Sequence, residues 1–375
     1  MSAELAMLAV AVVTALACAL PGTVLVLRRL ALVSDAISHA ILPGIVLAFF
    51  LTHDLNSPLL LIAAAGTGLL TVVLIETVSR SGLVGEDAAI GLVFSALFSL
   101  GVILVSRGAK GVHLDVDAVL LGQLALVPFD ELVVAGHAVG PKALWSMGVI
   151  LLANLALVVV AFKELKLAIL DAPHAAMLGF SPAVLHYAVM ALTSVTAVGA
   201  FQAVGSILVV ALMVAPPATA YLVSRRFSAM LVASAAFAVT ATLAGAAAAF
   251  AADVSIAGAM ATAAGVQFAL VFLLAPRRGL LWQARRRYRQ RLEFAGRMLV
   301  VHLAHHEGRA EAAVESRPDA LHRHLKWSHP FAQRVIRYAA ASRLVHVAGP
   351  LLELTAEGRR LAHRLIAEGP PRPRV

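Results

Sequence analysis

Long runs of apolar residues, separated by short polar stretches, recur along the first three quarters of the chain. A helix that spans a bilayer needs about 20 consecutive apolar residues, and most of these runs reach that length almost without charge. Their apolar positions are continuous rather than alternating, which favours helices over the strands of a β-barrel. We expect spans at 5–27, 57–75, 88–106, 143–162, 185–224, 227–252 and 254–276, with a further apolar run at 41–51.

The run at 185–224 is too long for one span, and we divide it near Phe201 and Gln202. This division predicts about nine transmembrane helices, or eight if one segment is re-entrant. The composition agrees, because 61% of the 375 residues are hydrophobic and 14% are charged, whereas soluble domains are about one quarter charged. Cys18 is the only cysteine, which excludes an internal disulfide and a cysteine-based zinc cluster.

Charge divides the chain into two parts of opposite sign. Residues 1–275 hold 10 Lys and Arg against 13 Asp and Glu, a net charge of −3, and residues 276–375 hold 20 against 8, a net charge of +12. A membrane domain and a basic, water-soluble tail are therefore expected. We place the transmembrane domain at 1–276, an arginine-rich juxtamembrane helix at 277–291, a small globular domain at 292–368 and a disordered tail at 369–375.

The basic residues of the short loops fall on alternate loops, and hence on one side of the membrane. Because cytoplasmic loops are enriched in lysine and arginine, we expect the N-terminus outside and the basic tail in the cytoplasm. Arginines beside the last span also predict contact with anionic membrane lipid. The loop residues are Arg28, Arg29, Arg80, Lys163, Lys166, Arg225, Arg226, Arg277 and Arg278.

A carboxylate and an imidazole, Asp35 and His39, stand four residues apart just before an apolar run. On a helix this spacing puts both side chains on one face, about one turn apart. They form half of a site for a borderline divalent ion such as Mn²⁺, Zn²⁺ or Fe²⁺, or they only cap the start of a cytoplasmic helix. Ser34 and Ser38 could orient the pair. Pro43 and Gly44 could break the helix and free backbone carbonyls toward a cavity.

The segment RRLALVSDAISHAILPGIVLAFFL, at 28–51, resembles the motif of the metal-ion ABC transporter permeases (ABC-3 type). That family imports manganese, zinc and iron with the help of a periplasmic binding protein. The segment departs from the family pattern mainly at Ala31, where serine is usual. The resemblance implies an all-α polytopic membrane protein, and it implies that Asp35 and His39 contact the metal ion in the translocation path.

The QAVG segment at 202–205, followed by Pro216 and Pro217, is similar to a second conserved part of that family. From the residues alone, small side chains that allow close helix packing and a proline kink explain the same pattern. Gln202 is a candidate to line the path or to bond between helices.

The loop from Leu170 to Pro182 resembles the coupling helix of the family, which docks on the ATPase of ABC importers. We assign Asp171, Leu178 and Gly179 to this role, with Gly179 supplying the positive φ that ends a short helix. An ordinary capped loop is the alternative interpretation.

The sequence contains no G-x-x-x-x-G-K-[ST] motif, so we expect a permease subunit that does not itself hydrolyse ATP. The resemblance implies a separate ATP-binding subunit, a periplasmic or lipid-anchored metal-binding protein, and a second permease subunit, identical or related. The ion is transported cargo, and no permanently bound cofactor is expected. The implied location is the bacterial inner membrane.

The tail has the order of elements found in a winged-helix domain. Helices are expected at 292–305 and 332–342, a hairpin at 344–354 and a final helix at 356–367 capped by Thr355. The string LTAEGRRLAHRLI resembles the end of winged-helix repressors, including metal-dependent ones. The predicted fold is thus a bundle of about eight or nine transmembrane helices with a small, cytoplasmic, winged-helix-like C-terminal domain.

The basic tail leaves a membrane-tethered, metal-responsive DNA-binding regulator as the alternative function. DNA is the less favoured partner, because a tail anchored in the membrane searches DNA poorly. His302, His305 and His306 cluster in the tail, which suggests either metal sensing or a solvated helix face. A secondary transporter that needs no ATPase is a third hypothesis.

Overall fold

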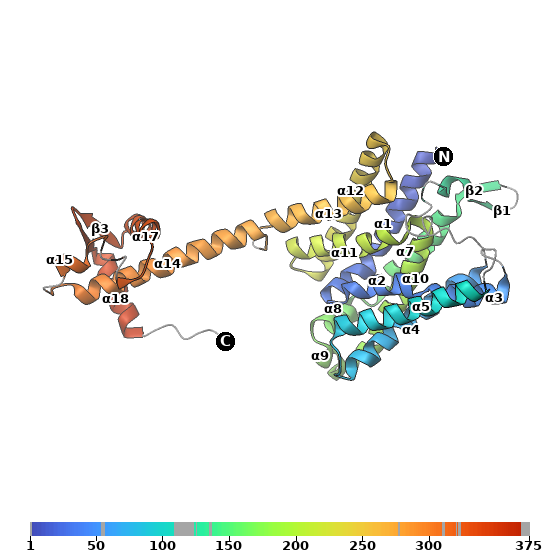
Figure 1. The fold of residues 1–375 in the computed structure, drawn as a ribbon, viewed down its shortest axis with the longest axis horizontal. Coiled ribbons are helices and arrows are strands. Elements are labelled where there is room, and N and C mark those ends of the chain that lie inside the picture. The colour runs from blue at the N-terminus through green and yellow to red at the C-terminus, as the bar shows by residue number, and fades with distance from the viewer. Residues whose placement is uncertain are drawn as a thin grey trace. The chain divides into compact units, whose positions relative to one another are not determined.

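The computed structural model divides the chain into two compact units, Met1–Gly279 and Leu280–Val375 (Figure 1). The tail expected at 369–375 lies outside the described residues. The structure describes residues 2–53, 57–108, 124, 126–134, 137–276, 278–309, 312–319, 321 and 324–368.

Within the described ranges, nine helical segments of the first unit are long and apolar enough to cross a membrane, the number expected if none of them is re-entrant. The long run expected to contain two spans is divided at Gly205, where φ is 86°, three residues beyond Gln202. The segments are α1 (Ala3–Leu27), α2 with α3 (Ala31–Ala40 and Leu42–Thr52), α4 (Pro58–Arg80), α5 (Glu86–Gly108), α7 (Lys142–Val160), α10 (Pro182–Val204), α11 (Ser206–Val223), α12 (Phe227–Ala252) and α13 (Ile256–Leu274).

Helix α1 is the centre of one group of helices, since it packs against α7, α10, α11 and α12 (Figure 1). Small residues allow this close approach. Gly22 of α1 lies against the backbone of Met213 in α11, and Gly245 of α12 lies against the backbone of Met260 in α13. A Cβ atom at either glycine would collide with the neighbouring helix, so these contacts depend on glycine.

Helices α2, α3, α4 and α5 form a second group, and α10 joins it to the first because it packs against both α4 and α1. Buried polar side chains connect the helices. Asn154 of α7 donates to the carbonyl of Ala17 and, at 2.8 Å, to the hydroxyl of Thr196 in α10. Ser194 of α10 donates to the carbonyl of Ala65 in α4 at 2.9 Å. These bonds satisfy polar groups within the bundle, where water is scarce.

The first unit also contains a short β-hairpin that the all-α expectation missed. A 3-10 turn, η1 (Val127–Phe129), leads into β1 (Glu131–Val134), which pairs antiparallel with β2 (His137–Pro141). Lys142 closes the hairpin, because its Nζ lies 2.6 Å from Asp130 and its backbone N–H donates to the Asp130 carbonyl. Strands of four and five residues carry too little alternation to be distinguished from a loop.

Two short helices, α8 (Phe162–Leu170) and α9 (Ala172–Met177), connect α7 to α10. Asp171 caps α9, since its Oδ1 accepts a hydrogen bond from the backbone N–H of His174 at 3.0 Å. Gly179 follows with φ of 87°, and Ser181 caps α10 with Pro182 at its first turn. The predicted short helix, glycine stop and proline start are therefore present.

The second unit is a small, separate core of helices and one hairpin. The segments expected at 277–291 and 292–305 are largely one continuous helix, α14, so the boundary near residue 291 falls inside a helix. The hairpin and the Thr355-capped helix agree with the sequence, with Gly358 donating to Thr355 Oγ1 at 3.0 Å. The elements are α14 (Leu280–His306), α15 (Ala312–Glu315), α17 (His329–Ala341), β3 (Val345–Ala348), β4 (Leu351–Leu354) and α18 (Ala356–Glu368).

Candidate functional site

Asp35 and His39 lie on one face of α2, as their spacing predicts. Asp35 Oδ1 is 3.6 Å from His39 Nε2, and the two side chains are 52% and 30% exposed. This distance is too long for a hydrogen bond. It is close to the separation of about 3.3 Å between two ligand atoms that share one ion with bonds of about 2.0–2.2 Å.

The pair points away from the core of its own helix bundle. Val33, Ala36 and Ile37, on the other face of α2, are buried. The ring of His39 lies beside the rings of Phe94 and Phe98 in α5, with centroids 5.7 and 6.4 Å away. Asp35 and His39 are therefore held on a helix with side chains that remain partly exposed.

Ser34 and Ser38, expected to orient this pair, are buried on the same helix. The Ser34 hydroxyl donates to the carbonyl of Ala31 at 2.8 Å, and the Ser38 hydroxyl donates to the carbonyl of Ser34 at 2.9 Å. Both donors are used within α2 and do not reach Asp35 or His39. A buried helical serine commonly satisfies its hydroxyl on the preceding turn in this way.

Pro43 and Gly44 follow a break at Ile41, which separates α2 from α3. Pro43 has no N–H, so it cannot donate to the carbonyl of His39 four residues earlier. The break therefore weakens the backbone bonding beside one of the two candidate ligands. Gly44 lies against Thr67 in α4, where a Cβ atom would collide. Gln202, the other candidate, is exposed in the last turn of α10.

The connection from α7 to α10, around α9, carries several exposed apolar side chains, which we call the α9 patch. They extend from the last residue of α8 to the turn before α10. Exposed apolar side chains at such a connection are candidates for contact with a partner. The members of the α9 patch are Leu170, Met177, Leu178 and Phe180.

A polar network that the sequence interpretation missed connects α1, α4 and α10. Glu76 of α4 pairs with Nε2 of His186 in α10, and Arg28 at the end of α1 contacts the Nδ1 of the same ring. Because arginine can only donate, Nδ1 accepts and Nε2 carries the proton that is shared with Glu76. Tyr187 and Arg80 also bond to Glu76, at 2.9 and 3.2 Å.

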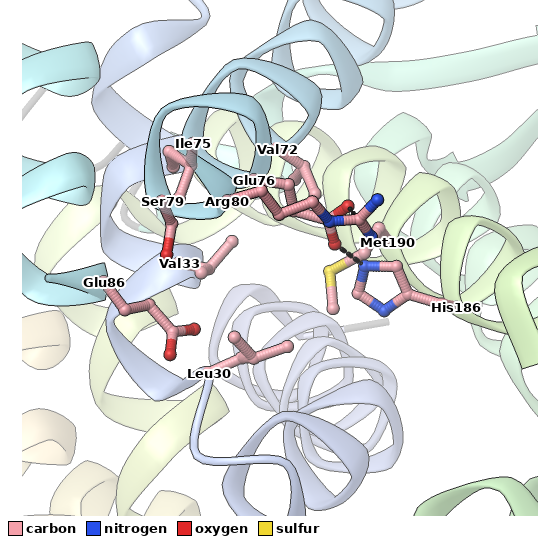
Figure 2. A pocket seen from close by; sticks show the side chains of 10 residues that line it. All are labelled: Leu30, Val33, Val72, Ile75, Glu76, Ser79, Arg80, Glu86, His186 and Met190. Atoms are coloured by element: carbon pink, nitrogen blue, oxygen red, sulfur yellow. Dashed lines mark hydrogen bonds and ion pairs between the residues drawn. The ribbon is translucent and has the colours of Figure 1, made fainter. Parts of the chain in front are cut away.

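This network borders a cavity of about 180 Å³. Figure 2 shows Glu76 and His186 bonded to each other at one side of it, with Arg80 beside Glu76. The sequence offered one indication of this network, which is that Glu76 is an ionisable residue near the end of an apolar span. Nothing in the sequence indicates that positions 76 and 186 form a pair. The cavity is lined by Leu30, Val33, Val72, Ile75, Glu76, Ser79, Arg80, Glu86, His186 and Met190.

Known proteins resemble the chain over most of its length. The zinc transport system membrane protein TroD of Treponema pallidum is 44% identical over 353 residues, covering 94% of this chain and 96% of TroD. The manganese transport system membrane protein MntD of Bacillus subtilis is 42% identical, covering 79% of this chain and all of MntD. The similarity to TroD thus extends well into the second unit.

A solved structure has the same fold in the first unit. PsaBC from Streptococcus pneumoniae, in complex with Fab, superposes with a TM-score of 0.63 at 29% identity, covering 74% of this chain and 94% of that one. The model of the ABC 3 transport family matches residues 3–275, which include the Asp35–His39 pair, the α9 patch and the Glu76 network. The chain therefore belongs to the ABC 3 transport family.

Proposed function

We propose that the chain is the permease subunit of an ATP-driven importer that carries a divalent transition metal ion, Mn²⁺, Zn²⁺ or Fe²⁺, across the inner membrane. The observation that carries this proposal is the partly exposed pair of Asp35 and His39 on α2, with Oδ1 and Nε2 3.6 Å apart. A carboxylate and an imidazole without a thiolate suit all three ions. The zinc and manganese names of the relatives support the same class of cargo.

Two ligands satisfy only part of the coordination of such an ion. The exposure of Asp35 and His39 supports a second permease subunit, identical or related, whose own pair completes the site between the subunits. A periplasmic or lipid-anchored metal-binding protein delivers the ion to the outer mouth. The Pro43 break beside His39 adds a carbonyl oxygen that is free of its usual helix bond.

The α9 patch supports docking on a separate ATP-binding subunit, which hydrolyses ATP for the complex. Asp171 and Gly179 fix the two ends of α9, so the short helix can transmit movement as a rigid piece. Leu178 at its end presents an exposed apolar side chain to the partner. Closure of the ATP-binding subunits then moves α9 and switches the side from which the metal pair is reached.

We infer a winged-helix-like, cytoplasmic domain for the second unit. Its order of α14, α17, the β3–β4 hairpin and α18 supports this arrangement. The basic residues of alternate loops support the orientation, with the N-terminus outside and Leu280 onward in the cytoplasm.

The test of the import proposal is uptake of ⁵⁴Mn²⁺ and ⁶⁵Zn²⁺ by cells that lack their own importers and express the complete transporter. Asp35→Asn keeps the size of the side chain and removes its negative charge, and His39→Gln removes the imidazole nitrogen. We expect each to lower uptake more than about tenfold, because losing one ligand of an ion costs well over 1.4 kcal/mol.

Asp87→Asn and His363→Gln are the matched controls, since both wild-type residues are exposed and lie outside the pair. They should retain uptake at equal expression. Wild-type uptake by the Asp35→Asn and His39→Gln variants would contradict the assigned path. Uptake that continues without the ATP-binding subunit would instead favour a secondary transporter.

A further inference from the structure

Three potential metal ligands meet at the end of α14 in the second unit, outside the segment 3–275 that matches the family. His302 and His306 are four residues apart on α14, so both rings lie on one face of the helix. Glu315 is the last residue of α15. One ligand atom from each of the three residues lies within 4.8 Å of the others.

Two of these ligand atoms are buried and have no hydrogen-bond partner among the described residues. They are Nε2 of His302 and Oε2 of Glu315, which lie 3.8 Å apart. The two side chains are only 12% and 13% exposed. A buried polar atom normally has a partner, and 3.8 Å is too long for a hydrogen bond. An ion with bonds of about 2.0–2.2 Å would satisfy both atoms after a small approach.

A fourth ligand is within reach. His324 Nε2 lies 3.2 Å from Oε1 of Glu315, and the His324 ring is 6.3 Å from that of His302. Three imidazoles and one carboxylate make a donor set for Zn²⁺, Fe²⁺ or another borderline divalent ion. Burial, reinforced by the nearby His306, lowers the pKa of His302, and the neutral ring is the form that binds a metal.

We propose that His302, His306 and Glu315 form a binding site for a divalent transition metal ion, with His324 as the fourth ligand. The ion connects α14 to α15 and to residue 324, and so closes the chain between residues 302 and 324 into a loop. The site is separate from the Asp35–His39 pair and does not depend on the proposed transport. It gives the second unit a means to respond to the metal concentration around it.

The test is metal binding by the full-length chain, purified in detergent and stripped with a chelator. Asp35→Ala and His39→Ala are introduced first, so that the candidate path contributes no bound ion. Equilibrium dialysis against Zn²⁺, followed by elemental analysis, then measures the remaining binding. We expect one Zn²⁺ per chain in this background.

Glu315→Gln and His302→Gln, added to that background, should each weaken Zn²⁺ binding by more than about 100-fold. Loss of a residue that only hydrogen-bonds to a metal ligand already lowers metal affinity roughly 10–100-fold, and these two residues are ligands in the proposed site. His305→Gln is the matched control, because His305 lies on the same helix and is exposed. It should bind Zn²⁺ as the background does. The proposal is overturned if the background binds no Zn²⁺, or if both ligand variants bind it unchanged.

X-ray absorption spectroscopy of Zn²⁺ bound to the Asp35→Ala, His39→Ala protein gives a second measurement. It does not depend on whether the variants of the proposed ligands fold. The expected spectrum has two or three imidazole ligands and at least one oxygen. A spectrum without imidazole would reject the site. Because cellular uptake is not measured, failure here leaves the import proposal standing, and failure of import leaves this site standing.

Discussion

The Tyr187 hydroxyl of α10 donates a hydrogen bond of 2.9 Å to Glu76 of α4, although the two residues are 111 positions apart in the sequence. The same carboxylate pairs with His186, which also contacts Arg28 at the end of α1. Glu76 therefore links α4 directly to α10 and, through His186, to the end of α1. The network should matter for stability because its central pair, Glu76 and His186, is largely removed from water.

Replacing Glu76 by alanine should destabilise the membrane unit by about 2–3 kcal/mol, because it leaves Arg28 and His186 without their acidic partner. Thermal unfolding in detergent, followed by circular dichroism, measures this change. Glu86→Ala is the control, since Glu86 lines the same cavity but is exposed. It should change stability by less than about 0.5 kcal/mol. Equal effects of the two variants would contradict a structural role for the network.

Replacing Leu178 by aspartate should uncouple the permease from its ATP-binding subunit. A charge placed in an apolar contact loses its hydration, and we expect metal-dependent ATP hydrolysis by the reconstituted complex to fall at least about tenfold. Leu83→Asp is the control, because Leu83 is exposed in the loop between α4 and α5. If both variants hydrolyse ATP at the wild-type rate, Leu178 is not part of the docking surface.

Replacing Gly245 by leucine should separate α12 from α13. The new side chain meets the backbone of Met260, which cannot move aside as a side chain would. We expect a loss of about 1–3 kcal/mol, measured as a lower midpoint of thermal unfolding. Gly265→Leu on α13 is a matched control, since its Cβ position is open. The predicted contact is wrong if Gly265→Leu destabilises the protein as much as Gly245→Leu.

Replacing Thr355 by alanine should loosen the last helix of the second unit by about 1 kcal/mol. The Thr355 hydroxyl accepts from the N–H of Gly358 at 3.0 Å and donates to the carbonyl of Arg343 at 2.6 Å. Hydrogen exchange of the α18 amides in the full-length chain should become several-fold faster. Thr355→Ser keeps both bonds and should exchange at nearly the wild-type rate; similar acceleration in both variants would exclude the cap as the cause.

The spans could be predicted from the sequence because each one is a local property of about 20 residues. The same holds for the short helix before Gly179 and for the Thr355 cap, whose cues lie within three or four positions of the feature they set. The shared face of Asp35 and His39 also follows from helical spacing. The break between α10 and α11 was misplaced by a few residues, because only the backbone shows that Gly205 adopts a positive φ.

Contacts between distant segments could not be predicted in this way. Glu76 and His186 pair only because α4 and α10 pack together, and a single sequence carries no information about that neighbour relation. Glu315 likewise joins His302 and His306 only after α15 folds back beside α14. Which local partner the hydroxyls of Ser34 and Ser38 choose could not be predicted either, and in the structure both donate to carbonyls of α2.

The position of His39 along its span also has an electrical consequence. His39 lies about 12 Å from the start of a 22-residue span that is about 33 Å long. In the proposed orientation, an ion that enters from outside therefore crosses roughly two thirds of the membrane before it reaches the pair. For two charges, an inside-negative potential of about 100 mV contributes up to about 3 kcal/mol to this step. In that orientation the membrane voltage assists loading of the pair from outside.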